Sequence, residues 1–548
     1  MNSSPLTDPP EILQKAADLL QAGQHPEAAA ALRRALDLAP ASPAVRRAVA
    51  RLSTLARTWL TLGQVRLALD TLAPLAESAH ADGTLLMLYG YALMAVGRKD
   101  DAEAVLRRWL AKDPGNRDAT LRLAAVLSDN GKASEAETVI RSVARGREDA
   151  DVAFVLGRAL LEQARFDEAE TQFRKVVQAR PEHQIAHGNL MELVWMRTGD
   201  VHEASRELDK VLHVHADSQG LRITKARLLT SARLPREALA AIDTGLQLAP
   251  SAQTLLAAAA TIALDFDGAR ALDYAKRLHA IAPHDRVAQV AVGNASLATG
   301  HAREALVIAE RLHDSDPTDG RALAMKADAL RMLGDSRYRE LLDYQHLVRA
   351  ELIDVPPGWI DLDAYLAELV TDLGRAHTLR AHPVGNSLRE GSQIQLAPQN
   401  SPFASIRAFP QAIDGPIRRY IQAIGDGNDP MRKRNTGCYR ISGIWSVRLR
   451  PTGFHVSHYH PEGWISSACY LHLPHAVERG GEGWLKFGEP AFPTHPALNP
   501  EYFVRPRPGL LALFPSYMWH GTVPFAGAPE DRRLTIAFDV VPVPLNDH

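Results

Sequence analysis

The chain has 548 residues, of which 46% are hydrophobic and 23% are charged, and its formal net charge is −2 at pH 7. This length exceeds what one ordinary hydrophobic core accommodates, so we expect two or more domains. Basic and acidic side chains are balanced on both sides of residue 350, so neither part has the basic excess typical of nucleic-acid binding.

The sequence carries no signal for export or membrane insertion. The first residues, MNSSPLTDPPEILQ, lack a basic stretch followed by an apolar run. No segment reaches the roughly 18 uninterrupted apolar residues of a spanning helix. The two cysteines, Cys438 and Cys469, give no disulfide framework and suit a reducing cytosol. We therefore expect a cytoplasmic protein that binds neither membranes nor nucleic acids.

An alanine recurs through the first two thirds of the chain, at intervals of 33 to 35 residues after a first interval of 40. A small residue is needed wherever two helices cross closely. Six of these alanines follow a glycine by five residues, and prolines end several of the intervening segments. The alanines are Ala28, Ala68, Ala102, Ala136, Ala169, Ala204, Ala238, Ala271 and Ala305, and the glycines are Gly23, Gly63, Gly97, Gly131, Gly199 and Gly300.

A period of about 34 residues with this pattern resembles tetratricopeptide repeats, which are pairs of antiparallel helices. About nine such pairs fit between residues 10 and 345. Each pair buries its apolar stripe only against its neighbours, so the array should form an all-α, right-handed superhelix with a long concave face. A surface of this kind suits an extended peptide or a partner protein.

The sequence changes character after DVPPGW, residues 354–359. Two amphipathic segments, at 362–377 and 409–425, predict helices. Short runs of alternating apolar residues bounded by proline and glycine then predict antiparallel strands. We therefore expect an α+β domain over residues 355–545, with its strands in a double-sheet, jelly-roll barrel. The predicted strands lie in GIWSVRLRP, SSACYLHLP, GWLKFGEP, GLLALFPS and RLTIAFDVV.

The stretch HVSHYHPEGW, residues 455–464, suggests a metal site within this domain. If it continues a strand after Gly453, alternation puts His458 and His460 on one face and His455 on the other. A third ligand must come from elsewhere in the chain. We expect it to be His520, which follows a strongly apolar strand in LALFPSYMWH.

The order of these motifs resembles the 2-oxoglutarate- and iron(II)-dependent oxygenases of the double-stranded β-helix fold, especially a bacterial group often joined to tetratricopeptide repeats. The resemblance covers about residues 355–545. In prolyl-hydroxylase-like relatives a glycine is followed five residues later by the H-x-D pair of the iron-binding triad, and Gly453 and His458 have that spacing. The distal histidine of the triad matches His520. The resemblance thus implies iron(II) bound by His458, His460 and His520.

The resemblance also implies a binding site for 2-oxoglutarate. The arginine that binds its 5-carboxylate, in an R-x-[ST] setting, matches Arg533 with Thr535. A tyrosine that can also touch this carboxylate matches Tyr470. The implied reaction consumes O2 and 2-oxoglutarate, releases succinate and CO2, and hydroxylates an unactivated C–H bond of the substrate.

One residue departs from the family pattern, because His460 stands where the usual triad has an aspartate. Neutral imidazole in place of carboxylate leaves an iron(II) site one unit more positive. An alternative assignment takes His460 and Glu462 as the paired ligands and leaves His458 outside them.

Other functions also fit parts of the pattern. A cupin-like barrel uses H-x-H with a distant histidine, and a zinc hydrolase can use three histidines, but neither gives Arg533 a role. The barrel could also be a non-catalytic metal-binding scaffold. As substrate we expect a side chain of a protein or peptide recruited by the repeats. The alternative is a small molecule, with the repeats used for oligomerisation or tethering. The sequence predicts no oligomeric state.

Overall fold

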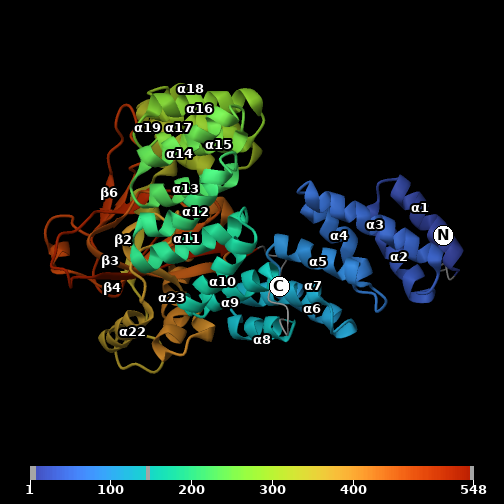
Figure 1. Cartoon of the computed structure of the whole chain (residues 1–548). Coiled ribbons are helices and arrows are strands. Elements are labelled where there is room, and N and C mark those ends of the chain that lie inside the picture. Colours follow the sequence, from blue (N-terminus) through green and yellow to red (C-terminus); the bar gives the residue numbers. More distant parts are fainter. Residues whose placement is uncertain (1–7, 144–148, 544–548) are drawn as a thin grey trace. The chain divides into compact units, whose positions relative to one another are not determined.

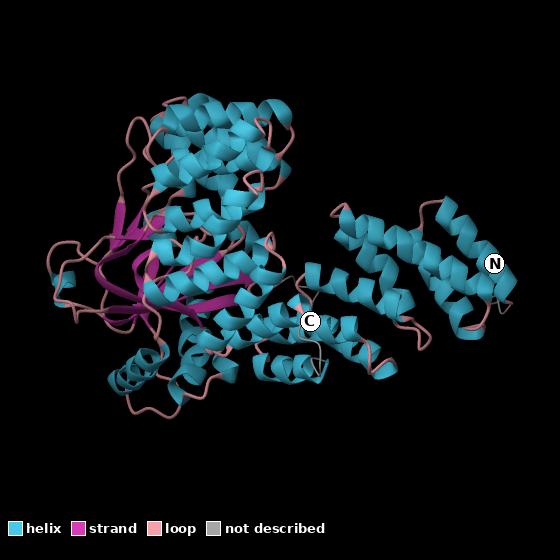
Figure 2. Cartoon of the chain, viewed as in Figure 1, coloured by secondary structure: helices cyan, strands magenta, loops and turns pink. Residues whose placement is uncertain are grey.

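The computed structural model describes residues 8–143 and 149–543. The chain divides into two compact units, Met1–Pro181 and Glu182–His548. The first contains only helices, whereas the second combines helices with all the strands of the described residues (Figures 1 and 2). Within the described residues no helix combines the length and apolar character that crossing a membrane requires.

The first unit is a series of antiparallel helical pairs, as the alanine period predicts. The recurrent alanines at the start of each second helix are buried, because the first helix of the pair packs directly over them. The helices are α1 (Pro9–Gln21), α2 (His25–Leu38), α3 (Pro43–Thr61), α4 (Val65–Ala76), α5 (Gly83–Ala95), α6 (Lys99–Lys112), α7 (Arg117–Asp129), α8 (Ala133–Val143), α9 (Ala150–Glu162) and α10 (Phe166–Ala179).

The turn inside eight of the nine pairs from α1 to α18 uses a left-handed backbone conformation. The six glycines of the repeat pattern have φ between 71° and 83° there, which glycine adopts without strain. In two pairs another residue takes the same position and the same conformation: Ala164 has φ 56° and Arg233 has φ 63°. The turn geometry is therefore kept at these two positions without glycine, whereas the turn between α15 and α16, which the structure describes in full, has no residue with positive φ.

The second unit continues the helical pairs and then adds the β-rich part. The predicted all-α array followed by an α+β region is confirmed. The repeat helices of this unit are α11 (Gln184–Thr198), α12 (Val201–Val214), α13 (Gln219–Ser231), α14 (Pro235–Leu248), α15 (Gln253–Ala263), α16 (Gly268–Ile281), α17 (Arg286–Ala298), α18 (Ala302–Ser315) and α19 (Gly320–Met332). The short helices α20 (Tyr338–Leu341) and α21 (Tyr344–Leu347) lead into the first strand.

Two antiparallel sheets form the β-rich part. The larger has the strand order β1-β7-β4-β9-β3-β2 and the smaller the order β6-β5-β8. The strands are β1 (Arg349–Leu352), β2 (Leu388–Gln395), β3 (Tyr439–His455), β4 (Ile465–His472), β5 (Leu485–Phe487), β6 (Tyr502–Val504), β7 (Leu510–Pro515), β8 (His520–Thr522) and β9 (Arg533–Pro542). Both predicted helices are present, as α22 (Leu362–Ala376) and α23 (Ala404–Ile424).

The repeats of the second unit and the β-rich part share one hydrophobic core. Leu323, Ala327 and Leu330 of α19 belong to the same buried cluster as strands β4, β7 and β9. Backbone groups also join them: the carbonyl of Met196 in α11 accepts hydrogen bonds from Arg380 and Ala381 at 2.8 and 3.0 Å. Helices α11–α19 therefore belong to the same compact unit as the strands. The boundary expected near residue 350 marks the change from helices to strands and not the division between compact units.

Candidate active site

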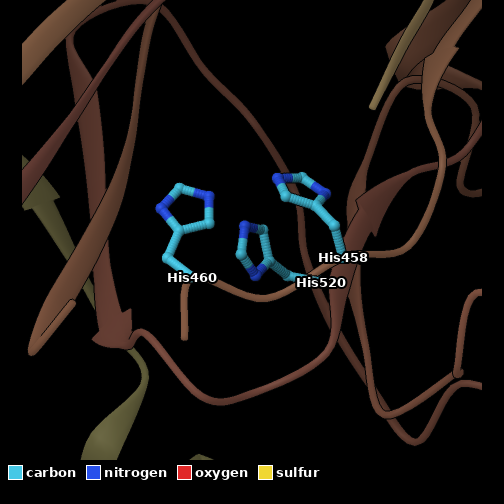
Figure 3. A group of neighbouring side chains, drawn as sticks. All are labelled: His458, His460 and His520. Atoms are coloured by element: carbon cyan, nitrogen blue, oxygen red, sulfur yellow. The ribbon is translucent and has the colours of Figure 1, made fainter. Parts of the chain in front are cut away.

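Three histidines predicted as metal ligands come together in the second unit. One ring nitrogen from each of His458, His460 and His520 lies within 4.8 Å of the others (Figure 3). Their ring centroids are 4.2 Å apart for His458 and His520, 5.2 Å for His458 and His460, and 5.3 Å for His460 and His520. Three imidazole nitrogens this close together could hold a single metal ion.

The backbone around the histidines is held by hydrogen bonds between distant segments. His458 and His520 form an isolated antiparallel bridge, with two N–H to O=C bonds of 2.9 Å. The amide of His460 donates to the carbonyl of Ser516 at 2.8 Å. The end of β7 and the start of β8 therefore fix the segment that follows β3.

The strand expected to run through His460 ends earlier, at His455. The alternation that would turn His455 away from the other histidines was therefore a wrong prediction. Its ring stacks on that of His458 at 5.8 Å, and its Nδ1 lies 3.0 Å from the hydroxyl of Ser387. His455 thus lies beside His458, next to the three candidate ligands.

Each of the three histidines has its Nδ1 engaged by an acceptor. His458 Nδ1 lies 2.9 Å from the carbonyl of Val456, and His520 Nδ1 lies 2.9 Å from that of Met518. A carbonyl only accepts, so each Nδ1 must carry the proton, and each Nε2 keeps a lone pair. Metal-binding histidines commonly donate their other ring N–H in this way.

The acceptor for His460 is a carboxylate. Its Nδ1 lies 2.6 and 2.7 Å from the two oxygens of Asp539 on β9. The hydroxyl of Ser466 also donates to Asp539, at 2.8 Å. A carboxylate behind the ring orients it and makes its other nitrogen a better electron donor. The three proposed ligands carry no negative charge, but the carboxylate of Asp539 lies directly behind the His460 ring.

Sequence reasoning missed Asp539, although a signal was available. Arg533 and Thr535 are two residues apart in the predicted strand RLTIAFDVV and so share one face, and the two-residue period puts Asp539 on that same face. This face of β9 therefore carries Arg533, the residue predicted to bind 2-oxoglutarate, at one end and the carboxylate of Asp539 at the other.

Burial keeps two of the candidate ligands, His458 and His520, neutral. It lowers the pKa of His458 to about 4, with repulsion from His460 adding to the effect. Burial also holds the pKa of His520 well below its ordinary value. Neutral imidazole is the form that binds a cation, so both rings are ready to bind at neutral pH.

Glu462, the alternative ligand, lies apart from the histidines. Its side chain is 85% exposed, and its carboxylate is 3.6 Å from the guanidinium of Arg321 on α19. It is not among the three residues whose ligand atoms converge. The geometry thus favours His458, His460 and His520 over a set that includes Glu462.

The residues predicted to hold 2-oxoglutarate also lie together. Thr535 on β9 is directly opposite Tyr470 on β4. The guanidinium carbon of Arg533 lies 5.1 Å from the centre of the Tyr470 ring. All three are buried, with exposures of 2% for Arg533, 0% for Tyr470 and 4% for Thr535. They form a polar group inside an otherwise apolar sheet interface.

Arg533 is a buried cation with no anionic partner among the described residues. Its Nε donates to the carbonyl of Gly483 at 3.1 Å, but no Asp or Glu side chain in the described chain pairs with it. The hydroxyl of Tyr470 is also buried and lacks a hydrogen-bond partner of good geometry. Burial raises the pKa of Tyr470 to about 12, although Arg533 opposes this. Buried charges are normally paired, so this pair suits an anionic ligand.

The repeats reach the neighbourhood of the site through Trp519. Its indole N–H donates to the carboxylate of Asp328 on α19 at 2.8 Å, and its ring meets that of Tyr459 edge to face at 4.5 Å. Asp328 is buried, which raises its pKa to about 7. Helix α19 thus supports the residue that immediately precedes His520.

Comparisons with known families agree with this arrangement. Residues 443–539 match the family described as "Putative 2OG-Fe(II) oxygenase". Residues 53–117, 93–153 and 150–183 match three families of tetratricopeptide repeats. The resemblance to repeats joined to an oxygenase domain is thereby confirmed. No curated protein matches the chain.

The solved structures that resemble the chain include three of low sequence identity. A tetratricopeptide repeat protein from Parabacteroides merdae is 15% identical, with a TM-score of 0.34, and the match covers 46% of this chain and 98% of that one. MamA from Desulfovibrio magneticus is 25% identical, with a TM-score of 0.27, over 30% of this chain and 95% of that one. A thermophilic repeat protein from Thermus thermophilus is 22% identical, with a TM-score of 0.24, over 34% of this chain and 99% of that one.

Proposed function

Because the chain joins tetratricopeptide repeats to a domain that matches a 2-oxoglutarate- and iron(II)-dependent oxygenase family, we propose that it is a dioxygenase that hydroxylates a side chain of a protein or peptide. The observation that carries this proposal is a pairing of two features. A group of three histidines with converging ring nitrogens lies in the same β-rich part of the chain as a buried arginine that has no carboxylate partner among the described residues.

His458, His460 and His520 would hold iron(II) through Nε2. With 2-oxoglutarate and O2 bound, the iron would supply the oxidation. One oxygen atom converts 2-oxoglutarate to succinate and CO2, and the other converts a C–H bond of the substrate to C–OH. Three neutral imidazoles leave the ion with its full positive charge, which favours a dianionic cosubstrate. Asp539, hydrogen-bonded to His460, offsets part of that charge without occupying a coordination position.

Arg533 would bind the distal carboxylate of 2-oxoglutarate. A guanidinium matches a carboxylate with two parallel hydrogen bonds, which orient the ligand as well as hold it. Thr535 and Tyr470 offer hydroxyls beside this position, and the buried Tyr470 hydroxyl gains a partner when the carboxylate binds. Both ends of the cosubstrate are thus matched by groups of opposite charge.

The peptide substrate is inferred from the repeats. Helices α11, α17 and α19 already contact the β-rich part of the same unit. We therefore assign recruitment of the polypeptide to the repeats of the first unit, α1–α10.

Anaerobic titration with iron(II), with and without 2-oxoglutarate, tests the oxygenase assignment. A visible charge-transfer band of the chelate is expected with the full-length protein and with His472→Ala, since His472 is exposed at the end of β4. The band should be lost in His458→Ala and His520→Ala. A wild-type protein that binds zinc but gives no band with iron(II) and 2-oxoglutarate would instead support a hydrolase or a scaffold.

A further inference from the structure

The second unit contains a pocket of about 360 Å³ whose lining includes none of the three candidate metal-binding histidines. Repeat helices α11 and α13 contribute one wall, and strands β2 and β3 with the loop before β2 contribute the other. It is lined by Trp195, Thr198, Gly199, Ser231, Ala232, Arg233, Arg380, Ala381, His382, Arg389, Glu390 and Arg450. Its size is at the lower end of the range for small-molecule sites.

The lining of this arginine pocket is strongly positive. Four guanidinium groups line it, against a single carboxylate, that of Glu390. Glu390 lies 3.4 Å from Arg450, which also donates to a backbone carbonyl. No Asp or Glu in the described part of the chain pairs with Arg233, Arg380 or Arg389. Three cations are therefore left without an anionic partner there.

Arg389 is half-buried and lines the pocket. Its Nη1 donates to the carbonyls of Asn386 and Leu388 at 2.6 and 2.7 Å, which fixes the guanidinium in place. Asp265 is close enough to influence its pKa but does not come within ion-pair distance. A guanidinium oriented by carbonyls still has donors to offer an incoming anion.

Arg233 reaches the pocket from a position that repeats of this chain usually give to glycine. It has φ 63° in the turn between α13 and α14, where six other pairs have glycine in the same conformation. A side chain is strained in this region, so the turn itself gains nothing from arginine. Its guanidinium carbon stands 5.8 Å from the centre of the Phe454 ring, and Phe454 is paired with Arg389 in the β2–β3 ladder.

The arginine pocket is close to the histidine group. Arg389 is paired with Phe454, and Leu388 with His455, in the β2–β3 ladder. Ser387, two residues before Arg389, lies 3.0 Å from His455 and 3.4 Å from His458. Two residues of a strand span about 7 Å, so an anion held by Arg389 lies within reach of a reactive centre at the histidines.

We propose that the arginine pocket binds an anionic group, a carboxylate or a phosphate, of the molecule that this protein oxidises. The pocket has room for one acidic group and the atoms next to it. The substrate is therefore an acidic molecule. The part of this proposal that concerns oxidation rests on the proposed function, whereas anion binding does not.

Calorimetric titration of the metal-free, full-length protein tests anion binding alone. The probes are inorganic phosphate and N-acetylaspartate amide, which separate the phosphate and carboxylate forms of the ligand. At least one should bind at millimolar concentration, and Arg233→Gly and Arg389→Gln should each weaken it by about tenfold. Arg233→Gly restores the residue that other turns use, so loss of binding there cannot come from a damaged fold.

Arg303→Gln is the matched control, because Arg303 is exposed on α18 and lines no part of the pocket. It removes the same charge and should leave binding unchanged. The proposal is overturned if neither probe binds, if Arg233→Gly and Arg389→Gln bind normally, or if Arg303→Gln weakens binding equally.

The distance to the histidine group is tested with manganese(II), a paramagnetic ion that the histidines can hold. If inorganic phosphate is the ligand, its phosphorus NMR relaxation should quicken when manganese and protein are both present, and Arg389→Gln should abolish the effect. If N-acetylaspartate amide is the ligand, its proton relaxation serves instead. Anion binding without this effect overturns the substrate assignment.

Manganese should bind the wild-type protein and not His458→Ala, which shows that the ion occupies the histidine group. Failure to bind the wild type contradicts the metal site and with it the proposed function. The calorimetric result then decides anion binding by itself.

Discussion

The imidazole Nδ1 of His460 lies 2.6 and 2.7 Å from the two carboxylate oxygens of Asp539. The H-x-H pair of this chain therefore has a carboxylate in contact with the ring that replaces the family's aspartate. If His460 binds the metal as proposed, the carboxylate charge lies behind the ligand, where it would still tune the ion.

Removing this carboxylate should weaken metal binding without unfolding the protein. We expect Asp539→Asn to lower the iron(II) affinity by about 10-fold or more, because the amide cannot stabilise positive charge on the ring. Anaerobic iron(II) titration measures this. Asp531→Asn, on the loop before β9, is the control and should behave as wild type.

A charge-restoring variant separates an electrostatic role of Asp539 from a structural one. His460→Asp in the Asp539→Asn background returns the carboxylate to the ligand position, and we expect iron(II) affinity to recover toward wild type. If the double variant binds no better than Asp539→Asn alone, Asp539 acts by holding the backbone and not by its charge.

Arg533→Ala should impair 2-oxoglutarate binding far more than iron binding. Losing one partner of a buried, charge-assisted pair costs about 2–5 kcal/mol, so the apparent constant for 2-oxoglutarate should rise roughly 30-fold or more. The measurement is the charge-transfer band as a function of 2-oxoglutarate at saturating iron(II). Arg532→Ala tests the neighbouring arginine, and an unchanged constant in Arg533→Ala with a raised one in Arg532→Ala would reverse the assignment.

The stability of the second unit should depend on pH through Asp328. Burial raises its pKa in the folded protein to about 7, above the value of about 4 for an unfolded chain. The folded state therefore binds the proton more tightly, so this group favours folding at low pH and loses that contribution as pH rises from about 4 to 7. Each unit of the difference corresponds to about 1.4 kcal/mol.

Asp328→Asn removes this titration and keeps an oxygen that accepts from Trp519. We expect the variant to unfold at a higher temperature than wild type at pH 8, with the difference shrinking toward pH 5. Thermal unfolding followed by circular dichroism across this range measures the effect. A difference that is constant with pH would mean that Asp328 does not titrate in the folded protein.

The repeats and the main strands were predictable because each depends on a local pattern. A small residue every 34 positions and glycine in the turn are fixed by how neighbouring helices cross. Strand β2 was missed because LREGSQIQ is polar and is interrupted at Glu390, where φ is 51° and the register shifts. Strands β6 and β8 have three residues each, too few to show alternation.

The candidate site was only partly predictable, because its remaining parts are long-range pairings. The spacing of the motifs identified His458, His460 and His520, but the contact of Asp539 with His460 joins residues 79 positions apart. The arginine pocket draws its side chains from two repeats and two strands. The spacing of residues within one helix or strand does not show which distant helices and strands it will contact.

A fragment of residues 350–548 should not fold alone, whereas residues 182–548 should. The shorter fragment would expose the core surface that Leu323, Ala327 and Leu330 of α19 cover. It would also leave Tyr517 without the carbonyl of Leu341, to which its hydroxyl donates at 2.7 Å. Expression of both fragments, followed by thermal unfolding, checks this. A cooperative transition in 350–548 would contradict the shared core.

The role of the first unit can then be tested with the 182–548 fragment. If α1–α10 recruit the polypeptide, removing them should leave 2-oxoglutarate binding intact but greatly reduce kcat/KM for a protein substrate, since recruitment raises the local concentration of the reacting side chain. A short acidic peptide carrying the same side chain should be oxidised equally by both forms, because it does not need the repeats. If the fragment oxidises the intact protein substrate with full kcat/KM, the first unit does not present the substrate, and oligomerisation or tethering becomes the better explanation of the repeats.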